Sequence, residues 1–424
     1  MNQALAFGYE GVARLARALS AIAPASDRKL VATFASRRDV MSRFAAFPRD
    51  RSRPLLWMHA PSVGEGLQAR PILELARQRR PATQLAYTWF SPSARPFANA
   101  LDVDFRDVLP FDARADMRSA LEALSPTALV FSKLDVWPTL AREASRRGTR
   151  LGLVSATLAP SSSRRSGLAR ALLRDAYARL DRVGAISTED ADRLVALGVP
   201  ARRVSVTGDV RYDQVWARAE QIDRTSALLA PLLNSRLTLV AGSTWSSDEA
   251  ALLPAWTRIV AHRPEARLII APHEPTSDHL RSIEHWADGA GLRTARLDSP
   301  GAADADVVIV DRVGVLGDLY ALADIAFVGG AFHAAGLHSV LEPAAFGAPV
   351  LFGPRYHGAR DARVLIDADA AHATDGVDAL HRALERWLDS RTECEAAGRA
   401  ARDVVHQGLG AAERSYALVA ELLG

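Results

Sequence analysis

Short apolar runs alternate with longer amphipathic stretches from about Pro54 onward, and no other feature constrains the fold as much. The first series of apolar runs comprises "PLLWMHA", "TQLAYTWF", "RDVLPF", "TALVFS", "RLGLVSA", "RVGAIS" and "RVSVTG". The second series comprises "LTLVAGST", "ARLIIAPH", "DVVIVD", "DIAFVGG" and "APVLFGP". Helical patterns such as "LQARPILELARQRR" and "EDADRLVALG" lie between most of these runs. Such alternation is typical of parallel sheets built from strand–helix–strand units, and it predicts the α/β class.

Two domains are expected from the chain length and from a gap between the two series. At 424 residues the chain exceeds the size at which a single core usually stops growing. The gap, around residues 213–235, is polar at first and has no strand pattern. We therefore predict a helical N-terminal segment over 1–50 and two Rossmann-like domains, over 51–215 and 216–424, that face each other across a cleft. In such sheets ligands bind at the carboxyl ends of the strands.

The first 24 residues predict an amphipathic helix. Glu10, Arg14 and Arg17 recur at helical spacing on one face, and the other faces carry apolar side chains, namely Phe7, Val12, Leu15, Leu19 and Ile22. The stretch lacks the basic start and apolar core of a secretory signal, and no apolar run in the chain reaches about 18 residues. Two alternatives stay open: a helix that lies in a membrane interface, or a helix packed on its own domain.

The charge and cysteine content exclude several classes of function. A net charge of +3 argues against bulk electrostatic binding of nucleic acid. The single cysteine, Cys394, cannot form an internal disulfide, and no group of residues has the spacing of a metal site. Lys29 and Lys133 are the only lysines among 52 basic side chains, so arginine supplies nearly all of the positive charge.

The stretch "WMHAPSVGEGLQ" places a single carboxylate, that of Glu65, where a predicted strand meets a predicted helix. One interpretation is structural, because Ser62 and Glu65 have the spacing of a capping box. The other is chemical, because a carboxylate at a strand end can take a proton from a substrate hydroxyl. A cap alone does not require His59, Pro61 and Gly64 beside it, which favours the chemical role.

A turn of small residues in "AGSTWSSDEAALL" is a candidate phosphate site. Gly242, Ser243 and Thr244 follow a strand directly, and Ser246 with Glu249 matches a capping box before the next helix. A helix N-terminus with free N–H groups and hydroxyls attracts phosphate, although many such turns bind nothing.

The stretch "FVGGAFHAAGLHSVLEPAAFGAPVLFGP" is the most informative. Gly329 and Gly330 end a strand and permit close approach of the backbone to a ligand. The predicted helix that follows carries Glu342 in its first turn, and three further candidates precede it: Gly336, His338 and Ser339. The carboxylate of Glu342 suits the helix dipole, and it equally suits the ribose diol of a nucleotide. The convergence of these features favours the nucleotide.

The stretch "TGDVRYD" places Arg211 just after another strand, near the junction between the domains. Its simplest interpretation is a surface side chain. Beside a phosphate site, however, Arg211 would neutralise a leaving nucleotide.

Taken together, these stretches resemble a known family, the 3-deoxy-D-manno-octulosonic acid (Kdo) transferases of lipopolysaccharide synthesis. The resemblance runs from about residue 54 to 365. "HAPSVGE" resembles the family's first signature, "TWFSPSA" its Thr-rich turn and "LVSATL" its Asn-Ala-Arg-Leu segment. "TGDVRYD" is similar to Gly-Asn-Leu-Lys-Phe-Asp, and "AGSTWSSDE" and "VGGAF…GLHSVLEPAAFG…LFGP" resemble the two donor-side signatures. The resemblance implies a GT-B fold and the use of CMP-Kdo to glycosylate a lipid A precursor.

Three motifs depart from the family's pattern. The family's Glu-Thr-Glu-Leu-Trp-Pro is "KLDVWP" here, so Lys133 replaces the first Glu and Asp135 stands where the second stands. Gly-Gly-His-Asn is "GLHS", which puts Ser339 in place of Asn, and Pro-Arg-His-Pro is "PHEP", with His273 and Glu274. These departures bear on the choice of acceptor more than on the sugar-nucleotide chemistry.

The resemblance implies a role for each candidate residue. Glu65 is the implied general base, with Ser62, Gly64 and Asp135 near the acceptor, although Asp135 and Ser132 also have the spacing of a helix cap. The donor-side residues are expected to hold the phosphate, the ribose and the departing CMP: Arg211, Ser243, Thr244, Gly329, Gly330, His338, Ser339 and Glu342.

The resemblance also implies an inverting transfer that needs no metal or cofactor, since CMP-Kdo is itself the donor substrate. It implies an enzyme at the cytoplasmic face of the bacterial inner membrane, because the tails of a lipid A precursor stay in the bilayer. The helical segment over 1–50 is then expected to be a membrane-association segment. His273 and His338 have either structural or contacting roles. The alternatives are another GT-B enzyme, such as a UDP-sugar 2-epimerase or a UDP-sugar transferase, and a relative that binds glycolipid or nucleotide without turnover.

Overall fold

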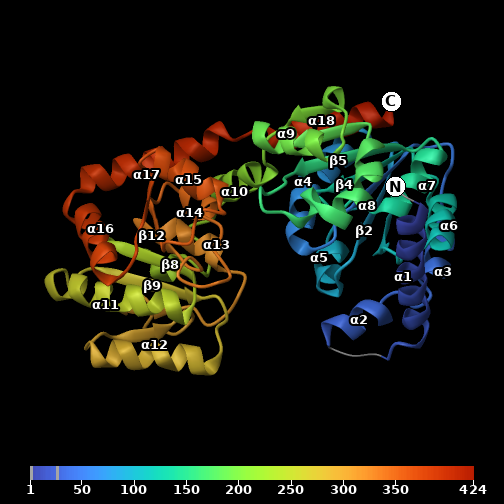
Figure 1. Ribbon diagram of the computed structural model, residues 1–424. Coiled ribbons are helices and arrows are strands. Elements are labelled where there is room, and N and C mark those ends of the chain that lie inside the picture. The colour runs from blue at the N-terminus through green and yellow to red at the C-terminus, as the bar shows by residue number, and fades with distance from the viewer. Residues whose placement is uncertain (1–2, 25–27) are drawn as a thin grey trace. The chain divides into compact units, whose positions relative to one another are not determined.

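The computed structural model describes residues 3–24 and 28–424. The chain divides into two compact units, the first made of Met1–Asp213 with Leu409–Gly424 and the second of Gln214–Gly408 (Figure 1). Each unit has one parallel sheet of seven strands with helices between the strands. The prediction of an α/β fold with two Rossmann-like domains is confirmed.

The sheet of the first unit has the strand order β3-β2-β1-β4-β5-β6-β7, and all neighbouring strands are parallel. Its strands are β1 Leu55–His59, β2 Gln84–Trp89, β3 Phe105–Val108, β4 Ala128–Ser132, β5 Arg150–Ala156, β6 Arg182–Ala185 and β7 Val204–Val206. β1, β2 and β4 are buried along their whole length, as expected of parallel strands covered on both faces. The order reverses between β1 and β4, so the loops that leave these strands form the topological switch point, where ligands bind in such sheets.

Two helices of the first unit begin at this switch point. α4 Val63–Arg79 follows β1, and α7 Pro138–Arg146 follows β4. The other helices between its strands are η1 Pro92–Ala94, α5 Arg95–Asn99, α6 Arg114–Leu124, η2 Ser163–Arg165, α8 Gly167–Ala178, α9 Thr188–Leu197 and η3 Ala201–Arg203.

The sheet of the second unit follows the same plan, with the order β10-β11-β9-β8-β12-β13-β14 and its switch point between β8 and β12. Its strands are β8 Thr238–Thr244, β9 Arg267–Pro272, β10 Thr294–Arg296, β11 Val307–Ile309, β12 Ile325–Val328, β13 Val350–Phe352 and β14 Ala371–Ala373. The sequence pattern misses the edge strands β10 and β14, because three partly exposed residues do not form an apolar run.

The helices of the second unit are mostly longer than its strands. α10 Val210–Glu220, which begins in the first unit, and η4 Ala230–Leu232 occupy the segment in which no strand was expected. The others are α11 Ser246–His262, α12 Ser277–Gly289, α13 Leu316–Leu319, η5 Tyr320–Leu322, α14 Leu341–Ala345, α15 Arg360–Asp367, α16 Val377–Asp389 and α17 Arg391–Gln407.

The C-terminal helix α18 Ala411–Leu423 belongs to the first unit, although the sequence analysis assigns residues 216–424 to the second domain. Five of its apolar side chains join the buried core of the first unit: Tyr416, Leu418, Val419, Leu422 and Leu423. The apolar pattern of a helix shows that it packs on a core, and it carries no information about which of two cores that is.

The N-terminal segment contains α1 Gln3–Ile22, α2 Lys29–Ala35 and α3 Val40–Ala45. α1 is attached through polar side chains, since the Tyr9 hydroxyl donates a 2.9 Å hydrogen bond to Asp112 and Arg17 lies 3.3 Å from Asp116. Its exposed apolar side chains are Phe7, Val12, Leu15 and Leu19. α1 therefore packs on its own unit and still presents an apolar face. Residues 1–2 and 25–27 of the predicted 1–50 segment, and the side chain of Ile22, lie outside the described part of the chain.

Within residues 3–24 and 28–424, no helix combines the length and the apolar character that spanning a bilayer requires.

Candidate active site

Glu65 lies at the switch point of the first sheet, in the first turn of α4. The Ser62 hydroxyl donates a hydrogen bond to the Glu65 carboxylate, and Ser62 makes no side-chain capping bond to α4. The capping box that the spacing of these two residues allows is therefore not formed. Gly64 is exposed, and the nearest atom to the place of a Cβ is the Ser62 Oγ, at 3.9 Å. Gly64 thus leaves room beside Glu65 for another molecule.

Lys133 is the charge partner of Glu65. Its Nζ lies 3.0 Å from Glu65 Oε1, and the Ser132 hydroxyl donates a 3.1 Å hydrogen bond to the backbone carbonyl of Glu65. Burial alone would raise the pKa of Glu65, but the Ser62 hydroxyl and the Lys133 ammonium together lower this pKa below its ordinary value. Glu65 is therefore ionised at neutral pH, which a proton acceptor must be.

Asp135 belongs to a second hydrogen-bonded group at the same strand ends. The indole N–H of Trp137 lies 3.0 Å from Asp135 Oδ2 and 3.1 Å from Nε2 of the buried His59. Burial would raise the pKa of Asp135, but hydrogen bonds from His59 and Trp137 lower it below its ordinary value. The carboxylate of Asp112 caps α7 by accepting 2.8 Å hydrogen bonds from the N–H groups of Thr139 and Leu140, and Ser132 bonds to Glu65 instead. The alternative that Ser132 and Asp135 cap a helix is therefore wrong.

At the switch point of the second sheet, the ends of β8 and β12 pack directly against each other. Ser243 has a φ of 54°, and a Cβ on Gly329 would lie 2.3 Å from the carbonyl oxygen of Ser243, so only glycine fits there. The buried carboxylate of Asp248 accepts hydrogen bonds from the N–H groups of Gly330, at 2.8 Å, and Phe332, at 3.0 Å. Asp248 thereby fixes the loop that follows β12.

Asp248 also caps α11. Its carboxylate accepts a 2.9 Å hydrogen bond from the N–H of Trp245, which is the N-cap residue of that helix. The capping box expected from Ser246 and Glu249 is therefore wrong by one position, because the helix begins at Ser246 itself.

The two hydroxyls of the small-residue turn differ in their partners. Thr244 is fully buried, and its hydroxyl donates a 2.7 Å hydrogen bond to Glu249, which also lies 2.9 Å from His279. Ser243 is partly exposed, and its hydroxyl has no hydrogen-bond partner among residues 3–24 and 28–424. Only Ser243 is thus free to bind a ligand.

Trp245 and three histidines form a stacked group at the same edge of the second sheet. The Trp245 ring lies between the rings of His273, at 4.6 Å, and His333, at 4.2 Å, and His338 stacks on His273 at 4.6 Å. The Trp245 indole N–H donates a 3.2 Å hydrogen bond to Nε2 of His338. Burial and the neighbouring His273 lower the pKa of His338, so its ring is neutral at neutral pH. His273 and His338 therefore both have structural partners.

Glu342 lies in the first turn of α14, as predicted. Within the part of the chain that the structure describes, its carboxylate makes no hydrogen bond or ion pair, and the same holds for the hydroxyl of Ser339. Burial raises the pKa of Glu342, and the charge of Arg218 only partly opposes this. Because buried polar groups are normally hydrogen-bonded, a largely buried carboxylate without protein donors is suited to accept hydrogen bonds from a ligand.

Arg211 lies in α10 and forms a bidentate pair with the buried Asp209, at N–O distances of 2.6 to 3.1 Å. It falls within the first unit, whereas the other donor-side candidates fall within the second. Its role beside a phosphate stays a prediction.

Four residues of the site have no role that sequence patterns predict: Lys133, Asp248, Trp245 and His333. The rarity of lysine was a usable signal for Lys133. The other three lie within or beside the quoted motifs, but the hydrogen bonds and ring stacking that make them part of the site join strand ends that are distant in the sequence.

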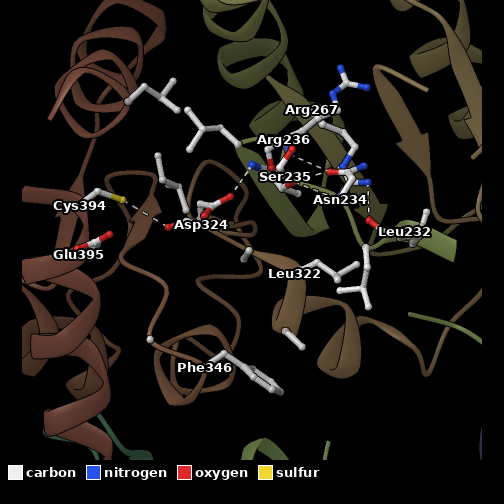
Figure 2. Close-up of a pocket in the computed structure, with 18 of the residues that line it drawn as sticks. Leu232, Asn234, Ser235, Arg236, Arg267, Leu322, Asp324, Phe346, Cys394 and Glu395 are labelled. Atoms are coloured by element: carbon white, nitrogen blue, oxygen red, sulfur yellow. Dashed lines mark hydrogen bonds between the residues drawn. The ribbon is translucent and has the colours of Figure 1, made fainter. Parts of the chain in front are cut away.

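A cavity of about 580 Å³ lies elsewhere in the second unit (Figure 2). Its lining includes the first residues of β8, β9 and β12. The cavity therefore lies at the N-terminal ends of these strands, whereas the switch-point loops leave their C-terminal ends. Cys394 lines it and lies 3.5 Å from the carbonyl oxygen of Asp324. Burial raises the pKa of the Cys394 thiol to about 11, so the thiol is protonated and unreactive at neutral pH.

Comparisons with known proteins agree on a family. The family model described as 3-deoxy-D-manno-octulosonic-acid transferase (kdotransferase) matches residues 38–214. The chain is 31% identical over 381 residues to the 3-deoxy-D-manno-octulosonic acid transferase of Bordetella pertussis, which covers 87% of each chain. It is 26% identical over 368 residues to the enzyme of the same name from Haemophilus influenzae, which covers 85% of each chain.

Solved structures agree on the fold. The UDP-GlcNAc 2-epimerase of Neisseria meningitidis superposes with a TM-score of 0.62 at 11% identity, over 87% of this chain and 99% of that one. A glycosyltransferase from Rickettsia africae superposes with a TM-score of 0.58 at 10% identity, over 88% of this chain and 98% of that one. At such low identity these likenesses show the two-domain GT-B type of fold alone. From the sequence relatives, the chain belongs to the 3-deoxy-D-manno-octulosonic acid transferase family and is a glycosyltransferase.

Proposed function

We propose that the chain transfers Kdo from CMP-Kdo to a hydroxyl of a lipid A precursor, with inversion at the anomeric carbon and without a metal ion or cofactor. Membership of the family supports the sugar and the class of reaction. The observation that carries the proposal is a pair of glutamates, Glu65 and Glu342. Each lies in the first turn of a helix at a switch point, and their pKa values are shifted in opposite directions.

Glu65 takes the proton in this reaction. A bond forms between the acceptor oxygen and the anomeric carbon of Kdo, while the bond from that carbon to a phosphate oxygen of CMP breaks. The electron pair of the broken bond leaves with CMP, and the proton of the acceptor hydroxyl goes to the Glu65 carboxylate. Gly64 leaves the space for the acceptor, and Asp135, held by His59 and Trp137, orients the acceptor or the sugar.

The second unit binds the nucleotide. Glu342 accepts hydrogen bonds from the ribose hydroxyls, and the unpartnered hydroxyls of Ser243 and Ser339 donate to the phosphate. Gly329 and Gly330 shape the loop after β12, because a Cβ on either would collide with the backbone of Ser243 or of Gly336. Arg211 supplies positive charge to the departing CMP. We assign no phosphate contact to Thr244, because its hydroxyl donates to Glu249.

The apolar face of α1 gives the protein a place at the membrane. Its four exposed apolar side chains would enter the boundary between lipid head groups and acyl chains, while its polar side stays docked on the first unit. We therefore infer a peripheral enzyme on the cytoplasmic face of the inner membrane, where its lipid acceptor lies.

The test is incubation of the full chain with CMP-Kdo and a defined lipid A precursor in the presence of a chelator. Mass spectrometry should show the acceptor heavier by one or more Kdo units, and NMR should show the inverted anomer. Calorimetry should show that CMP binds more tightly than UDP. Binding of CMP without product would favour a non-catalytic relative, and preference for UDP would favour the other GT-B activities; either result refutes the proposal.

A further inference from the structure

Lys133 is an unusual residue for this chain. It is one of two lysines among 52 basic side chains, and it is the one that pairs with Glu65. A guanidinium grips a carboxylate through two parallel hydrogen bonds, whereas an ammonium is a point charge on a flexible stem. An ion pair that must open during a reaction is better made with lysine.

The backbone at Lys133 is also unusual. Lys133 follows β4 directly and has a φ of 66°, in the left-handed region that non-glycine residues rarely occupy. Its N–H donates a 2.8 Å hydrogen bond to the carbonyl oxygen of Val154, which helps to hold this conformation. Such strained positions cluster at ligand and active sites, because the surrounding structure must maintain them.

The two partners of the ion pair differ in their access to solvent. The Lys133 side chain is 42% exposed and the Glu65 side chain is 16% exposed, so an arriving anion reaches the ammonium first. Glu65 has other supports, since Ser62 bonds to its carboxylate and Ser132 bonds to its backbone carbonyl. The Glu65 carboxylate therefore keeps its position when the ammonium moves away.

Loss of the ammonium changes the chemistry of Glu65. Burial raises the pKa of this carboxyl, and the lowering by Ser62 and Lys133 outweighs the effect of burial. Without Lys133 the effect of burial prevails to a greater extent, and the pKa moves towards the working pH. A carboxylate with a higher pKa is a stronger proton acceptor, provided that it stays ionised.

We propose that Lys133 leaves Glu65 to bind an anionic group of a substrate, a carboxylate or a phosphate, and that this exchange releases Glu65 to act as the proton acceptor. The exchange rests on the function proposed above and adds to it a specificity residue that couples substrate binding to activation of the base. The anion is either the carboxylate of the transferred acidic sugar or a phosphate on the glycolipid acceptor. In both cases the Lys133 ammonium exchanges the Glu65 carboxylate for another anionic partner. No covalent bond is made or broken in this exchange.

The first experiment measures the Glu65 carboxyl directly by ¹³C NMR titration of the full chain. In Lys133→Met the pKa of Glu65 should be higher than in the wild type. Rising concentrations of inorganic phosphate, or of free Kdo, should raise this pKa in the wild type and leave it unchanged in Lys133→Met. The probe that works identifies the type of anion. If neither probe moves the pKa in the wild type, the exchange does not occur.

The second experiment uses turnover. Lys133→Met should raise KM for one of the two substrates by about tenfold or more, the loss typical of one charge-assisted hydrogen bond. It should also move the acid limb of kcat/KM to higher pH. Lys133→Arg should keep KM low but reduce kcat, because the guanidinium holds Glu65 more firmly. Arg70→Met, which removes an exposed cation paired with Glu74 on the same helix, should change none of these values.

A purely structural Lys133 would move the acid limb in Lys133→Met but leave both KM values unchanged, and that result would overturn the inference. Circular dichroism and thermal unfolding should show that the variant is folded. Should the wild type make no product, the function proposed above fails, while the NMR titration still decides whether the exchange takes place.

Discussion

The two units of the chain each place a glutamate in the first turn of a helix at a switch point, and the surroundings of the two differ. Glu65 has a hydroxyl and an ammonium beside it, and its pKa is lowered in spite of burial. Glu342 has no hydrogen-bonding or ion-pairing partner among the described residues, and burial raises its pKa. Carboxylates whose environments push their pKa values apart usually have different tasks. The fold supplies the positions, and the neighbouring side chains decide the roles.

The largest effect should come from Glu65→Gln. The amide keeps the size of the side chain but cannot take a proton, so kcat should fall by about 10²–10⁴-fold, as is typical for loss of a general base. The Kd for CMP should stay the same, because the nucleotide belongs to the second unit. Steady-state kinetics and calorimetry measure the two quantities.

Glu74→Gln is the matched control for this variant, since Glu74 lies exposed on the same helix and should tolerate the change. Near-normal turnover in Glu65→Gln would show that Glu65 is not the general base, and the two glutamates would then not differ as a base and a binding residue.

The reverse pattern is expected for Glu342→Gln. Loss of a charged acceptor for the ribose hydroxyls should raise the Kd for CMP by about tenfold to a hundredfold, the range for a hydrogen bond to a charged group. The turnover of bound substrate should change much less. Calorimetry with CMP measures the effect, and the exposed Glu385 on α16 of the same unit, changed to Gln, serves as the control. Equal affinity in wild type and variant would remove Glu342 from the nucleotide site.

The sequence alone predicts much of this comparison. The apolar runs locate the strands that end at both switch points, and the motifs locate Glu65 and Glu342, because the carboxyl ends of parallel strands gather at one edge of a sheet. Sequence spacing could not distinguish Glu65 as a cap from Glu65 as the partner of Lys133. That distinction depends on a contact between two strand ends 68 positions apart.

The same limit applies elsewhere. The capping box of α11 lies one residue before the predicted position, because the helix begins at Ser246, and the spacing gives no sign that Asp248 also holds the loop after β12, 82 positions away. The apolar face of α18 predicts that the helix packs on a core, but it does not predict which of the two cores that is. Periodicity and motifs report local structure, whereas the ion pair of Glu65, the second role of Asp248 and the core on which α18 packs depend on long-range contacts.

Changes to the exposed apolar face of α1 should affect membrane binding and use of the lipid acceptor, and should leave nucleotide binding by the second unit unchanged. Replacement of Val12, Leu15 and Leu19 by Gln removes exposed apolar area, so sedimentation with anionic lipid vesicles should fall by about tenfold. The KM for the lipid acceptor should rise, and the Kd for CMP should not change. Val313→Gln, which removes an exposed apolar side chain from the second unit, is the control. Vesicle binding that survives the triple change would mean that α1 is only a packed helix.

The smallest effect is the pH dependence of nucleoside binding, and its sign follows from the two pKa shifts. The ionised form of Glu342 is the better acceptor for ribose hydroxyls, and burial raises its pKa above the ordinary value of 4.5. The affinity for the ribose should therefore fall as the pH is lowered through this raised pKa, by a few-fold over about one pH unit. Glu65, whose pKa is lowered from 4.5, should stay ionised over the same range.

Cytidine is the appropriate ligand for the calorimetry, because the phosphate of CMP itself titrates near pH 6. The slope should vanish in Glu342→Gln and persist in Glu65→Gln. The opposite result would exchange the roles of the two carboxylates.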